Sequence, residues 1–233
     1  MSQVNLKDVQ QKLYEKLQSS GWDRILRGFV LSEEFYKILD RLLTESNLGD
    51  KFTPMIKDLF RAFEECPYTD LKIVLVGQDP YPKVDVADGI AFSCSKSDVQ
   101  ASLKYIYTGM RDEGIEPSPD KDLSHLSRQG ILMLNTALTT QVKQIGSHVE
   151  LWKPFTNYLL DTLSANNTGL VYIFMGKKAQ EFSYLIDSDL NYKLECSHPA
   201  SAAYSGQKIW KSNGVFTETN RLIEKNFNTK INW

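Results

Sequence analysis

The chain has few of the residues that mark secreted, metal-binding or membrane proteins. Its 233 residues include three cysteines, Cys66, Cys94 and Cys196, which are widely spaced and form no paired ligand motif. Such a set is typical of reduced thiols and argues against a disulfide framework or a zinc site. No apolar run approaches the roughly 20 residues of a membrane helix, and no basic stretch followed by an apolar one opens the chain. We expect an intracellular protein without a membrane segment, cytoplasmic in a bacterial or phage-infected cell or nuclear in a eukaryote.

Neither sign of charge is in excess. The chain contains 27 Lys and Arg residues and 29 Asp and Glu residues, which gives a net charge of −2. Proteins that bind nucleic acid without sequence preference usually carry an excess of Lys and Arg, so this balance argues mildly against such binding. A local basic face can still form around Lys177-Lys178, or around Lys208 and Lys211. Composition therefore leaves the binding partner open.

The chain does contain a regular alternation of strand-like and helix-like segments. Four mostly apolar, strand-like runs occupy 71–76, 131–134, 170–175 and 192–196, and amphipathic stretches such as 102–111 and 152–164 lie between them. This alternation favours a parallel sheet with helices on both faces. We predict a single domain over residues 1–233 of the α/β class, with three α/β/α layers and a central four-stranded parallel sheet.

The first seventy residues, 1–70, are predicted to be mostly helical and to pack on that sheet. Apolar residues recur at helical spacing over 33–43 and again over 55–63. Pro54 precedes the second stretch at a position that suits the first turn of a helix. We therefore expect a helix in each stretch.

Each of the four predicted strands ends in polar residues or glycine. The ends read Gln78-Asp79-Pro80-Tyr81, Asn135-Thr136, Gly176-Lys177-Lys178 and Ser197-His198-Pro199. Pro80 and Pro82 each fix φ and remove a backbone donor, so a rigid turn follows the first strand. Because ligands of open α/β sheets bind outside the carboxyl ends of the strands, an acid, an amide and a base are expected to meet there.

The order and spacing of these motifs are similar to those of the family-1 uracil-DNA glycosylases, from about residue 22 to residue 233. The shared pieces include Lys72–Tyr81, Gly89–Ser93, Gly130–Thr136, Ser197–Pro199 and Ile231–Trp233. The resemblance implies hydrolysis of the N-glycosidic bond of deoxyuridine in DNA, after the nucleotide is flipped out of the helix. It implies an abasic site and free uracil as products, with no metal and no cofactor.

The resemblance also assigns roles to residues at the strand ends. Asp79 matches the catalytic carboxylate, and His198 matches the histidine that stabilises the departing uracil anion. Four residues match the uracil pocket: the backbone of Gln78, the Tyr81 wall against thymine, the stacking Phe92, and the Asn135 amide that reads the base. Each has a structural alternative, since a turn Asp before Pro, a core Phe or Tyr, a capping Asn and a loop His are all common. His148, in Ser147-His148, is given a structural or DNA-proximal role.

Several positions of the DNA-binding loops depart from the family pattern. Pro82 replaces a histidine, Lys177 replaces a serine after Gly176, and the proline-rich loop after Phe92 is missing although Ser102 still aligns with a phosphate contact. After Ser197, His198 and Pro199, Ala202 stands where the family carries a leucine wedge, and Tyr204 is a candidate substitute. The set of DNA contacts therefore comprises Pro82, Ser102, Gly176, Lys177, Ser197, Pro199, Ala202 and Tyr204.

Two functions from different classes are consistent with the sequence. The first is a monomeric uracil-DNA glycosylase that acts on single- or double-stranded uracil-containing DNA and is a target for a proteinaceous inhibitor of the family. The second is a DNA-binding, replication-accessory protein on the same fold with weak glycosylase activity. Because Asp79, Tyr81, Phe92, Asn135 and His198 are all present, the enzyme is favoured.

Overall fold

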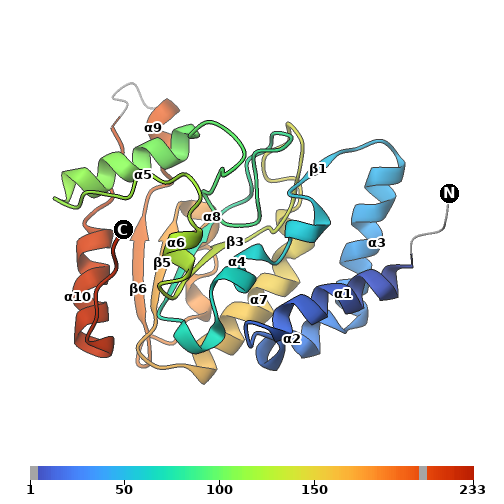
Figure 1. The fold of residues 1–233 in the computed structure, drawn as a ribbon, viewed down its shortest axis with the longest axis horizontal. Helices are drawn as coiled ribbons and strands as arrows, with labels where there is room; N and C mark the ends of the chain where they lie inside the picture. The colour runs from blue at the N-terminus through green and yellow to red at the C-terminus, as the bar shows by residue number, and fades with distance from the viewer. Residues whose placement is uncertain (1–4, 205–208) are drawn as a thin grey trace.

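The computed structural model describes residues 5–204 and 209–233 and has a parallel sheet at its centre (Figure 1). The sheet consists of β2 (Ile73–Gly77), β3 (Ile131–Asn135), β5 (Val171–Met175) and β6 (Tyr192–Cys196), in the order β3-β2-β5-β6. All three pairings are parallel. The predicted strands are thus confirmed in number, direction and approximate position.

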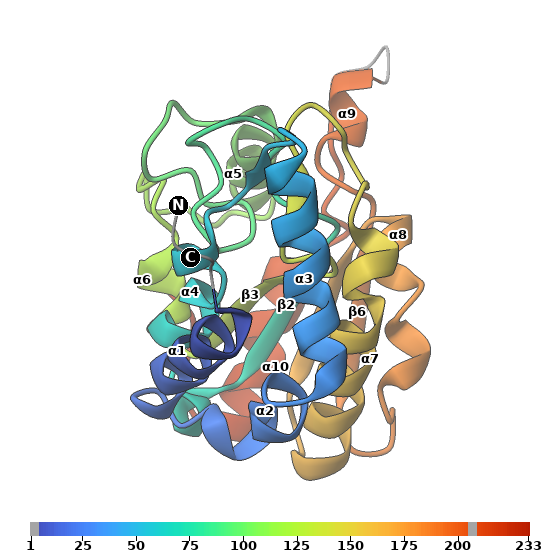
Figure 2. The same ribbon diagram turned by 90° about the vertical axis from the view of Figure 1, so that its right-hand side faces the viewer.

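Helices cover both faces of this sheet, as predicted for the fold class. Figure 1 shows α10 on one side of the strands and α7 on the other, and Figure 2 shows α2 and α3 alongside α7. The helices are α1 (Leu6–Gln18), α2 (Asp23–Val30), α3 (Glu33–Asn47), α4 (Arg61–Glu65), α5 (Ala101–Asp112), α6 (Ser124–Ser127), α7 (Val149–Asn166), α8 (Lys177–Gln180), α9 (Ser201–Tyr204) and α10 (Val215–Phe227).

The first helices begin at polar caps and bury one apolar face. The side chain of Asn5 accepts a hydrogen bond from the backbone of Lys7 before α1, and that of Ser32 accepts one from Phe35 before α3. These caps satisfy N–H groups that have no partner inside a helix. The apolar faces of α1, α2 and α3 belong to the same hydrophobic core as the central sheet.

The helix predicted over 55–63 is wrong. The chain there forms a 3-10 turn, Ile56–Asp58, followed by the short helix α4, and Pro54 lies outside both after a cis peptide bond. Leu59, Phe60 and Phe63 are nevertheless buried. The helical spacing of these apolar residues therefore reflects their packing into the core and does not require one continuous helix.

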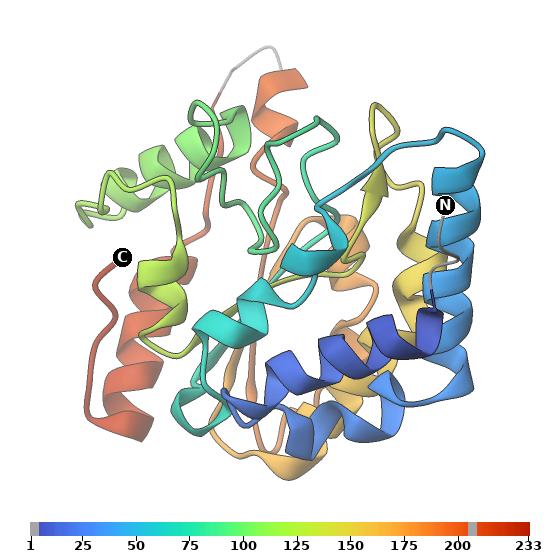
Figure 3. The ribbon, with the colours of Figure 1, turned by 45° about the vertical axis from the view of Figure 1, so that its right-hand side comes forward.

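The carboxyl ends of the strands face a set of connecting segments. α9 follows β6, and the loop after the short strand β4 (Thr140–Gln141) lies at the same end of the molecule (Figure 3). β4 pairs with β1 (Phe52–Thr53) in a separate antiparallel sheet. Among the described residues, no helix is both long enough and apolar enough to cross a membrane.

Candidate active site

A cavity of about 280 Å³ opens at the carboxyl ends of β2 and β3. This volume lies just below the range for ligand pockets, roughly 300–1,000 Å³, and therefore suits a small ring. The residues that line it include Gln78, Asp79, Tyr81, Phe92, Asn135 and His198, all of which were predicted from the sequence. The topology thus brings the three strand ends that follow β2, β3 and β6 to one cavity.

The turn after β2 is held to the end of β3 by hydrogen bonds. Gly77 pairs in register with Asn135, and the Gln78 carbonyl then accepts from the hydroxyl of Thr136 at 2.7 Å and from the N–H of Ala137 at 2.9 Å. Gly77 has no room for a side chain, because a Cβ there would lie 2.6 Å from Asn135 Oδ1. Asp79 and Asn135 therefore emerge side by side from a rigid framework.

Asp79 is a partly buried carboxylate with two donors on one oxygen. Its Oδ2 accepts a hydrogen bond from the backbone N–H of Gly146 and another from the hydroxyl of Thr140 at 3.3 Å. Burial raises the pKa of Asp79 above its usual value, and these hydrogen bonds oppose that rise. The donors hold the side chain at the cavity wall and stabilise its ionised form.

His198 follows the carboxyl end of β6, and its hydrogen bonding defines its tautomer. Its Nδ1 accepts a hydrogen bond from the backbone N–H of Ala200 at 3.1 Å, so the ring hydrogen of the neutral form is on Nε2. Burial lowers the pKa of His198 below its usual value, which favours this neutral form. The imidazole can therefore act as a hydrogen-bond donor to a ligand in the cavity.

Phe92 and Tyr81 form an aromatic wall. The Phe92 ring lies 5.9 Å from the ring of His198 between centroids, and only 8% of the residue is exposed. Phe92 has a positive φ of 64°, an uncommon conformation for a bulky residue. The hydroxyl of Tyr81 donates to the Phe92 carbonyl at 3.0 Å, and burial raises the pKa of Tyr81. The wall is thus fixed before any ligand enters.

Asn135 supplies an amide to the cavity. Its side chain lines the cavity, where its carbonyl oxygen can accept a hydrogen bond from a ligand and its NH₂ group can donate one. An amide that presents an acceptor and a donor together matches the edge of a base that offers the complementary pair.

The predicted DNA contacts are only partly brought together. Pro82 and Ser102 line the cavity. Gly176, Lys177 and Ser197 line an adjoining hollow of about 600 Å³, which Gln78 and His198 also border. Pro199 is buried. Ala202, which stands at the wedge position, is 2% exposed and belongs to the core, so its contact with DNA stays a prediction. The side chain of Tyr204 lies outside what the structure describes.

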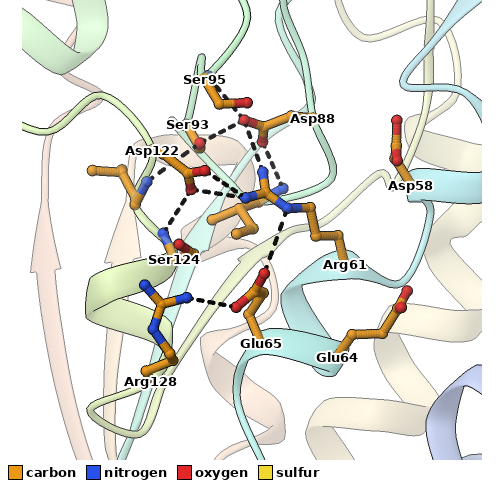
Figure 4. Close-up of polar contacts among 12 residues, drawn as sticks. Asp58, Arg61, Glu64, Glu65, Asp88, Ser93, Ser95, Asp122, Ser124 and Arg128 are labelled. Carbon is orange, nitrogen blue, oxygen red and sulfur yellow. Dashed lines mark hydrogen bonds and ion pairs between the residues drawn. The ribbon is translucent and has the colours of Figure 1, made fainter.

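A charged network that the sequence did not predict surrounds the buried Asp88 (Figure 4). Asp88, which is 1% exposed, accepts hydrogen bonds from the hydroxyl of Ser93 and from the N–H groups of Ile90 and Ser95. Arg61, from α4, pairs with Asp88 at 3.0 Å and also binds both carboxylate oxygens of Asp122. The loop that carries Phe92 is therefore tied to two other segments.

A second buried network supports the segment that binds Asp79. His148 is 2% exposed, and its Nε2 lies 2.9 Å from Oε2 of Glu45, while its Nδ1 lies 2.8 Å from the hydroxyl of Thr139. Trp152 donates to that same hydroxyl at 2.7 Å. The structure therefore supports the structural alternative for His148, and Glu45 is its unpredicted partner.

No cluster of three or more His, Cys, Asp or Glu side chains among the described residues is arranged to hold a metal ion. The three cysteines are free and buried. The chemical groups that line the cavity include a carboxylate, an imidazole, the amides of Gln78 and Asn135, and the rings of Tyr81 and Phe92.

Comparison with known proteins gives a consistent result. The model of the uracil DNA glycosylase superfamily matches residues 63–224. A uracil-DNA glycosylase of Wolinella succinogenes is 33% identical over 216 residues, which cover 91% of this chain and 93% of that protein.

Two solved structures share the fold at lower identity. The crystal structure of mimivirus uracil-DNA glycosylase is 24% identical, with a TM-score of 0.83 over 99% of this chain and 89% of that one. A variant of the mimivirus enzyme in complex with UGI is also 24% identical, with a TM-score of 0.83 over 99% of this chain and 91% of that chain.

Proposed function

We infer that this chain, which belongs to the uracil-DNA glycosylase superfamily, hydrolyses the N-glycosidic bond of deoxyuridine in DNA and releases uracil. The observation that carries this conclusion is the convergence of Asp79, Asn135 and His198 on one small cavity walled by Phe92 and Tyr81. The target bond lies inside the double helix, so the nucleotide must first be flipped into the cavity.

Base recognition is assigned to the aromatic wall and the amide. Phe92 stacks on the flipped base, and the Asn135 amide pairs with O4 and N3–H of uracil, a combination that cytosine does not offer. Tyr81 faces C5 of the base, where the methyl group of thymine would collide with the ring. A pocket that merely lacks room for a methyl discriminates by about 1–3 kcal/mol. The hydrogen bond from Tyr81 to the Phe92 carbonyl holds the Tyr81 ring in place, so we expect stronger discrimination against thymine.

Bond cleavage is assigned to the two titratable groups. As the bond breaks, positive charge develops on the sugar and negative charge on uracil. The ionised Asp79 stabilises the sugar cation and orients the attacking water. His198 donates its Nε2–H to uracil O2, which supports the departing anion without requiring a charged imidazole. The backbone donors to Asp79 and His198 favour these two protonation states.

The DNA backbone is proposed to lie across the adjoining hollow. The exposed Lys177 supplies a cation there, next to Gly176 and Ser197, and Ser102 supplies a hydroxyl near the cavity. We propose that the protein acts as a monomer on intracellular DNA, with the backbone of Gln78 and the loop around Pro82 and Pro199 completing the contact surface. Because a mimivirus variant is known in complex with UGI, this surface is also the proposed site for a proteinaceous inhibitor.

The test is uracil release from a single-stranded oligonucleotide in the presence of a chelator. Release by the wild-type protein, and its loss in Asp79→Asn with DNA binding retained, is the expected result. Saturating binding without any release would overturn the proposal and would favour a DNA-binding accessory protein.

A further inference from the structure

The rim of the cavity carries one exposed apolar side chain that the proposed chemistry does not use. Ile145 lines the cavity and is 65% exposed. Of the large apolar side chains that are exposed in the described part of the chain, Ile145 is the one that also borders the cavity. Scattered exposed apolar residues are normal, so the position of Ile145 matters more than its exposure.

The loop that presents Ile145 is braced at both ends. Gln144 forms a bridge with Gln141, and its carbonyl accepts from the hydroxyl of Thr140 at 2.8 Å. Lys143, with a positive φ of 69°, donates its N–H to the Pro82 carbonyl at 2.9 Å. The residue after Ile145 is Gly146, whose N–H binds Asp79. The side chain is therefore held next to the carboxylate by a short and well-bonded turn.

The opposite rim offers no comparable side chain among the described residues. Ala202 is buried, and the neighbouring exposed residues Ser197 and Ser201 are small and polar. A protein that flips one nucleotide out of a duplex needs to compensate for lost stacking, and apolar side chains inserted beside the base steps are a general way to do so. Ile145 has the exposure, the chemistry and the place for this contact.

We propose that Ile145 contacts the nucleotide next to the flipped deoxyuridine and stabilises the opened duplex. The proposal rests on the inferred uracil-DNA glycosylase function and adds a residue that determines preference between double- and single-stranded substrates. The occupant is the DNA strand itself: once the uracil is in the cavity, its neighbours in the same strand must pass over the rim.

The experiment compares Ile145→Ala, Ile145→Leu and the wild type on single-stranded and duplex oligonucleotides that contain one uracil. Leu48→Ala is the matched control, because Leu48 is 78% exposed and lines neither the cavity nor the adjoining hollow. Because Ile145→Ala removes most of an aliphatic side chain that becomes buried against the DNA, it is expected to lower kcat/KM on duplex DNA by about 10-fold. Activity on single-stranded DNA is expected to change by less than about 2-fold, because there is little stacking to replace.

A second readout follows the flipped state directly. Duplexes with 2-aminopurine beside a non-cleavable deoxyuridine analogue become more fluorescent when the neighbouring base is unstacked. Ile145→Ala is expected to reduce this signal, whereas Ile145→Leu and Leu48→Ala retain it. Equal losses of activity on both substrates would overturn the proposal, since they would show that Ile145 only positions Gly146 and Asp79. No change on duplex DNA would overturn it too. Failure of the wild type on single-stranded DNA would instead refute the proposed function.

Discussion

The addition of a single methyl group at Gly176 should impair catalysis as well as stability. Gly176 lies between β5 and α8 with φ of 94° and ψ of 161°. That combination is open almost only to glycine. A Cβ built on Gly176 would lie 2.6 Å from Cβ of His198 and 3.3 Å from its Cα and Cδ2. The close approach of His198 to the backbone therefore depends on the missing side chain.

The expected size of the effect of Gly176→Ala follows from these distances. The unfavourable backbone conformation costs about 1–3 kcal/mol of stability. To reach 3.4 Å, where ordinary contact begins, His198 must move by about 0.8 Å. Because a displacement of ~1 Å at a reacting centre can cost about 10²-fold in rate, kcat is expected to fall by roughly that factor. KM for single-stranded DNA is expected to change little, because the His198 contact to uracil strengthens only as the bond breaks.

Gly49→Ala is the control that isolates the collision. Gly49 has a φ of 95°, and a Cβ there would meet nothing within 4 Å. Both variants are expected to lose similar stability in urea denaturation, but only Gly176→Ala should lose single-turnover uracil release. The reasoning would be refuted if both variants kept full activity, or if Gly176→Ala raised KM and left kcat intact.

Three further predictions concern the groups around the cavity. The value of kcat/KM is expected to fall only as the pH is lowered, because Asp79 must be ionised and His198 must be neutral. Since the pKa of His198 is lowered, the loss of activity caused by its protonation should occur below about pH 6.5. Arg61→Leu leaves Asp88 buried without its charged partner and is expected to cost about 3 kcal/mol in urea denaturation, whereas the exposed Arg128→Ala should cost less than about 1 kcal/mol. Glu45→Ala removes the acceptor of His148 and is expected to cost about 1–3 kcal/mol, with thermal unfolding as the measurement. An alkaline limb set by Tyr81, or equal costs for Arg61→Leu and Arg128→Ala, would contradict these assignments.

The three strands β2, β3 and β5 could be predicted from the sequence because they are buried on both faces, whereas the edge strand β6 is only partly buried. The run predicted over 71–76 is β2, Ile73–Gly77, and all five of its residues are buried. In such a strand every position is apolar, so the signal does not depend on the register. The candidate site followed from the same fact, since parallel strands end at one edge and their polar ends must meet there.

The charged networks could not be predicted because their members are distant in the sequence. Glu45 and His148 are separated by 103 positions, and Arg61 and Asp122 by 61. Glu45 stands in an otherwise ordinary amphipathic helix, where a charged residue is normally on the solvated face. Only the packing of α3 against the start of α7 reveals that this carboxylate is buried.

The loop after β6 shows a different limit. Matching Ala202 to a wedge position assumed that an aligned residue keeps the same exposure, but a small side chain can turn into the core where a leucine would not fit. Ile145 gave no signal in the sequence, because an isolated isoleucine in a polar loop is unremarkable until its neighbours are known.

Backbone donors favour the protonation states that the chemistry needs, in addition to the effect of burial. Gly146 donates its N–H to Asp79, and Ala200 donates its N–H to Nδ1 of His198. Any residue except proline carries that donor, so neither position is recognisable from its side chain. The catalytic side chains are visible in the sequence because their chemistry resides in their own functional groups. What makes Asp79 an anion and His198 a donor is the path of two loops, and that path is stabilised by backbone contacts such as the hydrogen bond from the Lys143 N–H to the Pro82 carbonyl. Substitutions that bend either loop should therefore impair uracil release while every catalytic side chain is still present.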